Sequence, residues 1–336
     1  STVSLALRND PRLRPETCER VQKVAASMGY RANATVAHLM AQLRISRTPN
    51  YQGTLGLLNA AEDATLLSTD PTYRKWVKGC HQRAGQLGYS LDTFWLHDPE
   101  LPANTLRRVL HARNIRGLLL AAVRSSHALP QDLFWRDFSC VSIGMHLPRP
   151  DLHFASNDQF STALRCVEAL LARGYRRPGL VLDPERDELI EYRFSGGFWA
   201  GQKKLKTKDR VPQLELTRLD IELFGSWLER QRPDCIATIH VEVKDWLAEL
   251  GYNVPADIGL AHLDLTDEPV HRDWAGMDQK NDVAGAAAVD LLVAQIHRSE
   301  SGIPEFARSL QIESEWVNGG TVRGKSGSPG QRRRKT

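Results

Sequence analysis

Residues 161–182 read STALRCVEALLARGYRRPGLVL, a helical pattern followed by a short apolar run. Apolar residues three and four positions apart predict a helix over 161–172. The run at 179–182 is short and apolar, which predicts a buried strand. Alternation of such helices and strands builds folds with a parallel sheet, so this stretch indicates an α/β architecture.

The same alternation extends over most of the chain from residue 54 onward. It predicts parallel sheets with helices on both faces, and ligands in such folds bind at the carboxyl ends of the strands. Eight strands fit two doubly wound lobes better than one very wide sheet. We expect strands at 54–58, 90–94, 117–122, 140–143, 179–182, 214–216, 235–239 and 258–263, and helices at 73–87, 103–112, 161–172 and 282–297.

The lobes take up most of the chain. We place the first lobe at 53–156, with 281–310 returning to it, and the second lobe at 157–280. We expect residues 308–317 to form a strand that crosses back between the two lobes.

The first 48 residues carry a different pattern, that of a small all-α segment. Residues 2–7 have the pattern of a helix that began upstream. Pro15 fits the first position of the next helix, and Gly29 fits the left-handed turn that ends it. Asn33 is a suitable N-cap for a third, short helix.

Charge is distributed unevenly along the chain. Of the net charge of +4, residues 1–48 contribute +5 and residues 323–336 contribute +6, which leaves −7 on the middle. A basic N-terminal arm on an acidic body is typical of modular DNA-binding proteins, because basic side chains displace counterions from phosphate. A solvated surface explains a basic stretch equally well from charge alone. The run at 324–336 is most simply a disordered basic tail.

Composition places the chain among globular proteins of two or three domains, because its 336 residues are 41% hydrophobic and 25% charged. Five widely spaced cysteines without a Cys-x-x-Cys pair indicate reduced thiols in a cytoplasmic protein, not disulfides or zinc ligands. No apolar run approaches the roughly 18 residues of a membrane span. The N-terminus does not have the pattern of a secretion signal.

Motifs of the common enzyme classes are missing from the sequence. It has no Gly-x-Gly-x-x-Gly, Walker loop, Gly-x-Ser-x-Gly or His-Glu-x-x-His. We therefore expect a protein that is not an enzyme and that has neither a cofactor nor a metal site.

Six short strings occur in a fixed order along nearly the whole chain. The first 44 residues contain Thr2-Val3-Ser4-x-Ala6-Leu7, Pro15-Glu16-Thr17-x-Glu19-Arg20-Val21 and Met28-Gly29-Tyr30-Arg31-x-Asn33. The body contains Gly174-Tyr175-Arg176-Arg177-Pro178-Gly179, Arg193-x3-Gly197-Phe198 and Gly251-Tyr252-x-Val254-Pro255-Ala256-Asp257-Ile258. In order and spacing the chain resembles the lactose/galactose-repressor (LacI/GalR) family of transcriptional regulators, truncated at its N-terminus within the helix-turn-helix.

The resemblance implies a partial helix-turn-helix, a hinge helix and a homodimeric, periplasmic-binding-protein-like core of two lobes. It implies that double-stranded operator DNA contacts Ser1, Thr2, Ser4, Leu5, Tyr30, Asn33 and Leu39. Leu39 matches a leucine that wedges into the minor groove, although an ordinary position on a short amphipathic helix is the alternative. Many relatives have Arg at the position of Leu5 and Asn at that of Arg8, so no operator sequence is carried over.

The resemblance also implies a small effector, which is a sugar, a sugar acid or a sugar phosphate. Arg193 matches the family's pocket arginine, whose fork of donors suits vicinal hydroxyls or a carboxylate. Asp264 follows an apolar run and can accept two hydroxyl protons. Gln279 matches a glutamine near the crossover between the lobes. Asp158 fits a helix cap and a pocket residue equally well.

One effector position departs from the family pattern. Relatives usually place Asn-Asp after the strand at 235–239, whereas this chain has His240-Val241. His240 can donate and accept hydrogen bonds, so it can take the place of the asparagine, and a satisfied polar histidine is the alternative. Aromatic rings can stack on a sugar, although packing is their commoner role; the candidates are Phe198, Trp199 and Trp274.

These expectations combine into one functional hypothesis. The chain is a cytoplasmic transcriptional regulator of carbohydrate metabolism genes, a repressor by this interpretation, and ligand-driven closure of its lobes changes how paired hinge helices meet. The alternative is a two-lobed sugar-binding protein without a DNA-regulatory role. That alternative predicts a secretion signal and no basic N-terminal segment.

Overall fold

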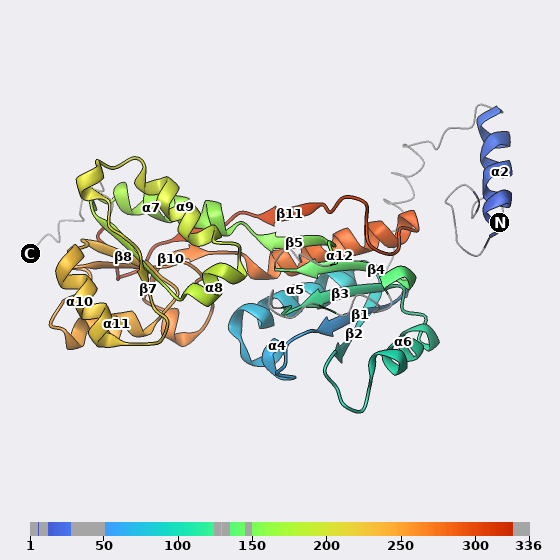
Figure 1. Ribbon diagram of the computed structural model, residues 1–336, viewed down its shortest axis with the longest axis horizontal. Coiled ribbons are helices and arrows are strands. Elements are labelled where there is room, and N and C mark those ends of the chain that lie inside the picture. The colour runs from blue at the N-terminus through green and yellow to red at the C-terminus, as the bar shows by residue number, and fades with distance from the viewer. Residues whose placement is uncertain are drawn as a thin grey trace, which may run out of the picture. The chain divides into compact units, whose positions relative to one another are not determined.

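The computed structural model describes residue 6 and residues 13–27, 51–123, 129, 135–144 and 150–324. It divides the chain into two compact units, each with its own six-stranded sheet (Figure 1). The first unit holds the chain up to Ser156 together with Asp282–Leu310. The second unit holds Asn157–Asn281 and the chain from Gln311 onward.

The N-terminal segment is described over one helix, α2 (Pro15–Ser27). Its start at Pro15 confirms the prediction from the sequence, because a fixed φ angle and a missing N–H are tolerated at the first helical position. Gln22 on this helix donates a hydrogen bond of 3.1 Å to the backbone carbonyl of Ala6. The third helix that we expect after Asn33 lies outside the described residues.

The first unit is built on a sheet whose strands lie in the order β11-β5-β4-β3-β1-β2. The pairs from β5 through β2 are parallel, as the alternation of strands and helices predicts. Buried leucines of β3 and α6 form much of its core, among them Leu118, Leu120, Leu106 and Leu110. Its strands are β1 (Gly53–Asn59), β2 (Tyr89–Trp95), β3 (Gly117–Ala121), β4 (Ser139–Ile143), β5 (His153–Asn157) and β11 (Ser309–Ile312), and its helices are α4 (Leu66–Thr69), α5 (Pro71–Gln86), α6 (Ala103–Ala112) and α12 (Asn281–Arg298).

The second unit repeats this architecture in the strand order β12-β10-β9-β8-β6-β7. Alternate residues of β6 face opposite sides, so Leu180 and Leu182 pack with α7 and α9 while Val181 packs with α10 and α11. The sheet is therefore covered on both faces (Figure 1). Its strands are β6 (Pro178–Leu182), β7 (Leu214–Glu215), β8 (Cys235–Thr238), β9 (Gly259–His262), β10 (Ala275–Asp278) and β12 (Glu315–Val317), and its helices are α7 (Gln159–Leu171), α8 (Pro184–Leu189), α9 (Arg193–Gln202), α10 (Ile221–Gln231) and α11 (Glu242–Glu249).

Two details of the strand prediction were wrong. Residues 308–317 do not form one strand, because β11 joins the first sheet and β12 pairs antiparallel with β10 in the second. The prediction also missed β5 and β10. Both strands are short and contain polar residues or glycine, such as Ser156 and Gly276, which interrupt the apolar pattern of a buried strand.

Helices α7 and α9 approach closely because α9 presents glycines to α7. A Cβ atom on Gly197 would lie 2.0 Å from the backbone oxygen of Phe160, and one on Gly201 would lie 2.7 Å from the side chain of Val167. Contacts this short require the helices to move apart. The glycines therefore fix the position of α9, and with it the place of Arg193 at the start of that helix.

We expect Gly197→Ala to lower the free energy of unfolding by about 1–3 kcal/mol, because the added methyl group overpacks the α7–α9 contact. Urea denaturation followed by circular dichroism measures this change. The matched control is Gly196→Ala on the same helix, where a Cβ atom meets only the ring of Phe160 at 3.7 Å. Equal stability of the two variants would contradict the role assigned to Gly197.

Candidate functional site

Polar side chains gather at one edge of the second sheet. Strands β6, β8, β9 and β10 are parallel, so their carboxyl ends meet at the same edge. One polar residue follows each of these strands directly or within two residues: Asp183 after β6, His240 after β8, Asp264 after β9 and Gln279 after β10. Three of them, His240, Asp264 and Gln279, are predicted effector residues. The carboxyl end of a parallel sheet is where ligands bind in doubly wound folds.

Asp264 is held in place by two neighbours. Its Oδ1 accepts a hydrogen bond of 2.9 Å from the side-chain amide of Asn281, which is only 1% exposed. Its backbone N–H donates a hydrogen bond of 3.1 Å to Nδ1 of His262. These two hydrogen bonds give the carboxylate a fixed orientation at the end of β9.

His262 is a buried residue that joins the ends of two strands. Its Nε2 lies 3.0 Å from the carbonyl oxygen of Ile239, beyond the end of β8, while its Nδ1 accepts the N–H of Asp264. These contacts require a neutral ring that carries its proton on Nε2. Burial lowers the pKa of His262 to about 3, which keeps the ring neutral. The rings of His271 and Trp274 pack against it, at 4.3 Å and 5.5 Å between centroids.

Lys280 and Gln279 follow β10 and differ in their contacts. Nζ of Lys280 binds Asp278 at 2.8 Å and Glu315 at 2.9 Å, and these carboxylates raise the pKa of the lysine. Gln279 is 4% exposed, and its Oε1 accepts no hydrogen bond from any described residue. A buried acceptor without a donor favours a ligand or water that supplies one.

Arg193 and Asp158 have contacts of their own. Arg193 is the first residue of α9 and pairs with Glu191 at 3.2 Å, with about a third of its side chain exposed. Asp158 is the N-cap of α7, where its two carboxylate oxygens accept hydrogen bonds from the backbone N–H and the hydroxyl of Ser161 at 3.0 Å and 2.6 Å. These contacts give Asp158 a capping role. Its role as an effector residue remains a prediction.

The aromatic candidates differ in exposure. Phe198 and Trp274 are each 2% exposed and belong to the two hydrophobic cores of the second unit. Trp199 is 58% exposed, and the ammonium group of Lys203 lies 4.0 Å from its ring centroid. Packing, the commoner role of such residues, therefore describes Phe198 and Trp274.

The predicted DNA-contacting residues cannot be placed, because all of them lie outside the described residues; they are Ser1, Thr2, Ser4, Leu5, Tyr30, Asn33 and Leu39. Two residues of the edge were missed from the sequence, Asp183 and His262. Asp183 carried a usable signal, since it is the first polar residue after an apolar strand. His262 had no such signal in the sequence, because it lies within its strand and its hydrogen-bond partners are known only from the fold.

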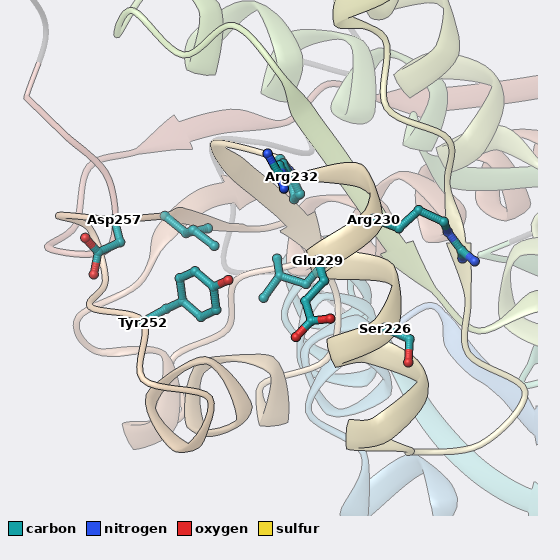
Figure 2. A pocket seen from close by; sticks show the side chains of 9 residues that line it. Ser226, Glu229, Arg230, Arg232, Tyr252 and Asp257 are labelled. Carbon is teal, nitrogen blue, oxygen red and sulfur yellow. The ribbon is translucent and has the colours of Figure 1, made fainter.

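A hollow of about 760 Å³ lies at the opposite edge of this sheet, where β8 and β9 begin. Figure 2 shows Tyr252 and Asp257 on one side of it and Glu229 and Arg232 on another. Its charged side chains are exposed, and none of the predicted effector residues lines it. The carboxyl edge is therefore the stronger candidate for an effector site.

Neither a membrane helix nor a metal cluster is found in the part of the chain that the structure describes. None of the described helices is both long and apolar enough to cross a membrane. No group of three or more His, Cys, Asp or Glu side chains among these residues is arranged to hold a metal ion.

Comparison with known proteins relates this architecture to one class of regulators. The chain is similar to the solved complex of the transcriptional regulator CelR with cellobiose, with a TM-score of 0.62, 16% identity and coverage of 95% of this chain and 94% of that one. It is also similar to a putative transcriptional regulator LacI from Bacillus cereus subsp. cytotoxis NVH 391-98, with a TM-score of 0.60, 20% identity and coverage of 81% and 99%. The chain has the fold of LacI-family transcriptional regulators.

The LacI-type fold is accompanied by a weaker similarity in sequence. Over 216 residues the chain is 20% identical to the HTH-type transcriptional regulator MalR of Streptococcus pneumoniae serotype 4. This match covers 64% of the chain and 57% of MalR, so it spans little more than half of that protein. No protein-family model matches the chain.

We expect protonation to destabilise the LacI-type core through His262. Burial lowers the pKa of this ring to about 3 in the folded protein, whereas in the unfolded chain the ring takes up a proton near its ordinary pKa of 6.5. Stability contributed by the neutral ring is therefore present above pH 6.5 and is lost as the pH falls below it.

Between pH 6 and pH 5 the free energy of unfolding should fall by about 1 kcal/mol more in the wild type than in His262→Gln. Urea titrations at each pH measure this slope. The control is His297→Gln, which removes an exposed histidine and should keep the wild-type slope. The same slope in the wild type and His262→Gln would contradict the assignment.

Proposed function

We propose that the protein is a sequence-specific DNA-binding transcriptional regulator, a repressor of carbohydrate metabolism genes, controlled by a small sugar-like effector. The observation that carries the proposal is a LacI-type fold whose second sheet ends in an ordered set of hydrogen-bonding side chains. Asp264, Gln279 and His240 supply hydrogen-bonding groups there, of the kind that a polyhydroxylated ligand needs.

The DNA-binding half of the proposal is supported by sequence. The strings between Thr2 and Asn33 resemble the headpiece of LacI-type regulators, and residues 1–48 carry a net charge of +5. Basic residues release counterions when they bind phosphates, which favours association with DNA. We propose double-stranded operator DNA as the partner, bound by a homodimer in the cytoplasm.

Control by the effector follows from linkage. If the sugar and the operator prefer different arrangements of the protein, each ligand changes the affinity for the other by the same factor. Such coupling is typically 1–3 kcal/mol, which corresponds to a change in affinity of about 5-fold to 150-fold. The names of similar proteins support the effector class, since CelR was solved with cellobiose.

The test is fluorescence anisotropy with labelled DNA from upstream of the gene itself and of its neighbours. The full-length gene product is titrated onto this DNA with and without each of a panel of sugars and sugar acids. We expect specific binding that one compound strengthens or weakens. Tight retention of a sugar without specific DNA binding would instead support the alternative, a two-lobed sugar-binding protein with no regulatory role.

We expect Arg193→Ala to abolish the response to the effector while it leaves DNA affinity in the absence of effector unchanged. The guanidinium supplies a fork of donors that alanine lacks. The control is Arg218→Ala, because Arg218 also pairs with a carboxylate two residues away on the same unit. Anisotropy with and without effector measures both variants, and a normal response in Arg193→Ala would remove this residue from the effector site.

A further inference from the structure

Asp183, directly after β6, keeps one carboxylate oxygen without a hydrogen bond. Its Oδ1 accepts the backbone N–H of Arg186 at 2.6 Å, where Asp183 caps α8. Its Oδ2 lies 3.6 Å from Nε2 of His240 and 3.8 Å from Nε of Arg186. Both separations are longer than a hydrogen bond. Among the described residues, no group donates a hydrogen bond to this oxygen.

His240 faces this oxygen from the neighbouring strand. Its backbone N–H is fixed by the hydroxyl of Thr238 at 3.0 Å, and its side chain is 15% exposed. Its Nε2 is buried and has no hydrogen-bond partner among the described residues. Beside a carboxylate, the favoured neutral form of the ring carries its proton on Nε2. A donor and an acceptor thus face each other without a bond between them.

We propose that Asp183 and His240 together recognise a hydroxyl group of the effector and select an uncharged sugar over sugar acids and sugar phosphates. This inference rests on the proposed function. A hydroxyl donates its proton to Oδ2 of Asp183 and accepts the N–H of His240. Because the two atoms are 3.6 Å apart, one oxygen can lie about 2.8 Å from each. Because Nε2 is buried, the ring of His240 has to turn toward the exposed side of Asp183, whose side chain is 26% exposed, for one hydroxyl to reach both atoms.

The charges around the pair disfavour an anion. Burial raises the pKa of Asp187, and the negative charges of Asp183 and Glu215 raise it further, so three carboxyl groups lie near one another. A carboxylate or phosphate would add charge of the same sign and has no proton to give to Asp183 at neutral pH.

Three cations of this unit are already paired with carboxylates. Arg186 lies beside Asp183, Arg193 pairs with Glu191, and Lys280 is held between two carboxylates. An anionic effector would therefore have to compete with these carboxylates for a cation. An uncharged sugar binds without that cost.

The pair also makes effector binding dependent on pH. The charged or titratable groups that face His240 are Asp183, Arg186, Glu242 and His262. Burial lowers the pKa of His240, so the ring is neutral at pH 7.5. When acid protonates the ring, its Nε2–H becomes a charged donor that bonds Oδ2 of Asp183 directly. The acceptor is then occupied, and affinity for an uncharged sugar falls.

Isothermal titration calorimetry on the full-length protein at pH 7.5 tests the inference. The probes are the uncharged sugars glucose, galactose, maltose and cellobiose, the uronates glucuronate and galacturonate, and glucose 6-phosphate. We expect an uncharged sugar to bind with the highest affinity. Asp183→Asn should weaken that binding about tenfold and narrow its advantage over the uronates, because the amide of asparagine donates to a carboxylate.

Two further variants separate recognition from a general effect of substitution. Asp257→Asn is the matched control, since Asp257 also accepts a backbone N–H but lies at the opposite edge of the sheet. It should keep wild-type affinity and preference. His240→Asn should still bind the sugar but lose the fall in affinity between pH 7.5 and pH 5.

Each of the following results contradicts either the inference or the proposed function. Binding of only a uronate or the phosphate by the wild type overturns the inference and leaves the proposed function standing. Unchanged affinity and preference in Asp183→Asn shows that Asp183 does not touch the effector. If no sugar binds and no sugar alters binding to DNA, both the inference and the effector part of the proposed function fail.

Discussion

The polar edge of the second sheet depends on one buried ring, that of His262. Its two nitrogens bond the chain beyond β8 and the chain beyond β9, so the exits of two neighbouring strands are tied together. The next strand is held just as closely, because a Cβ atom on Gly276 would lie 2.1 Å from the carbonyl oxygen of His262. The ring can make both bonds only while it is neutral, and burial ensures that state. The two hydrogen bonds of His262 therefore set the positions of His240 and Asp264.

Ion pairs determine what kind of ligand the edge can take. Lys280 and Arg193 both lie near it, yet each is paired with a carboxylate of the protein. Acceptor oxygens without a hydrogen bond from a described residue remain on Gln279 and Asp183. Hydroxyl groups satisfy such acceptors without adding charge. The chemistry of the edge is therefore that of hydrogen bonding to a neutral ligand.

The sequence predicts the architecture well, for a physical reason. Buried parallel strands are apolar on both faces, so runs such as 117–122 and 179–182 stand out between amphipathic helices. Two six-stranded sheets confirm the doubly wound fold. The strands that were missed, β5 and β10, pair in the sheets although polar residues or glycine interrupt them, because their neighbours supply the hydrogen bonds.

The candidate site is predicted less completely, because its geometry comes from residues far apart in the chain. Asp264 follows a predicted strand and could be named from that fact, whereas Gln279 follows β10, which was missed, and was named from the family resemblance. His262 could not, since its role depends on the carbonyl oxygen of Ile239, 23 residues away. Asp158 differs from His262 because its partner is local. The sequence pattern indicates a helix cap that involves Ser161, but it is equally compatible with an effector-binding role for the same carboxylate.

The structure shows which residue accompanies His240, where the sequence departs from the family pattern. Where relatives usually have Asn-Asp after this strand, the chain has His240-Val241 and so lacks a carboxylate at that point. The fold brings Asp183 from the adjacent strand to within 3.6 Å of the imidazole. A donor and a carboxylate are thus both present, but they come from two strands instead of one. Because the donor is an imidazole instead of an amide, the pair can titrate, and an asparagine in its place cannot.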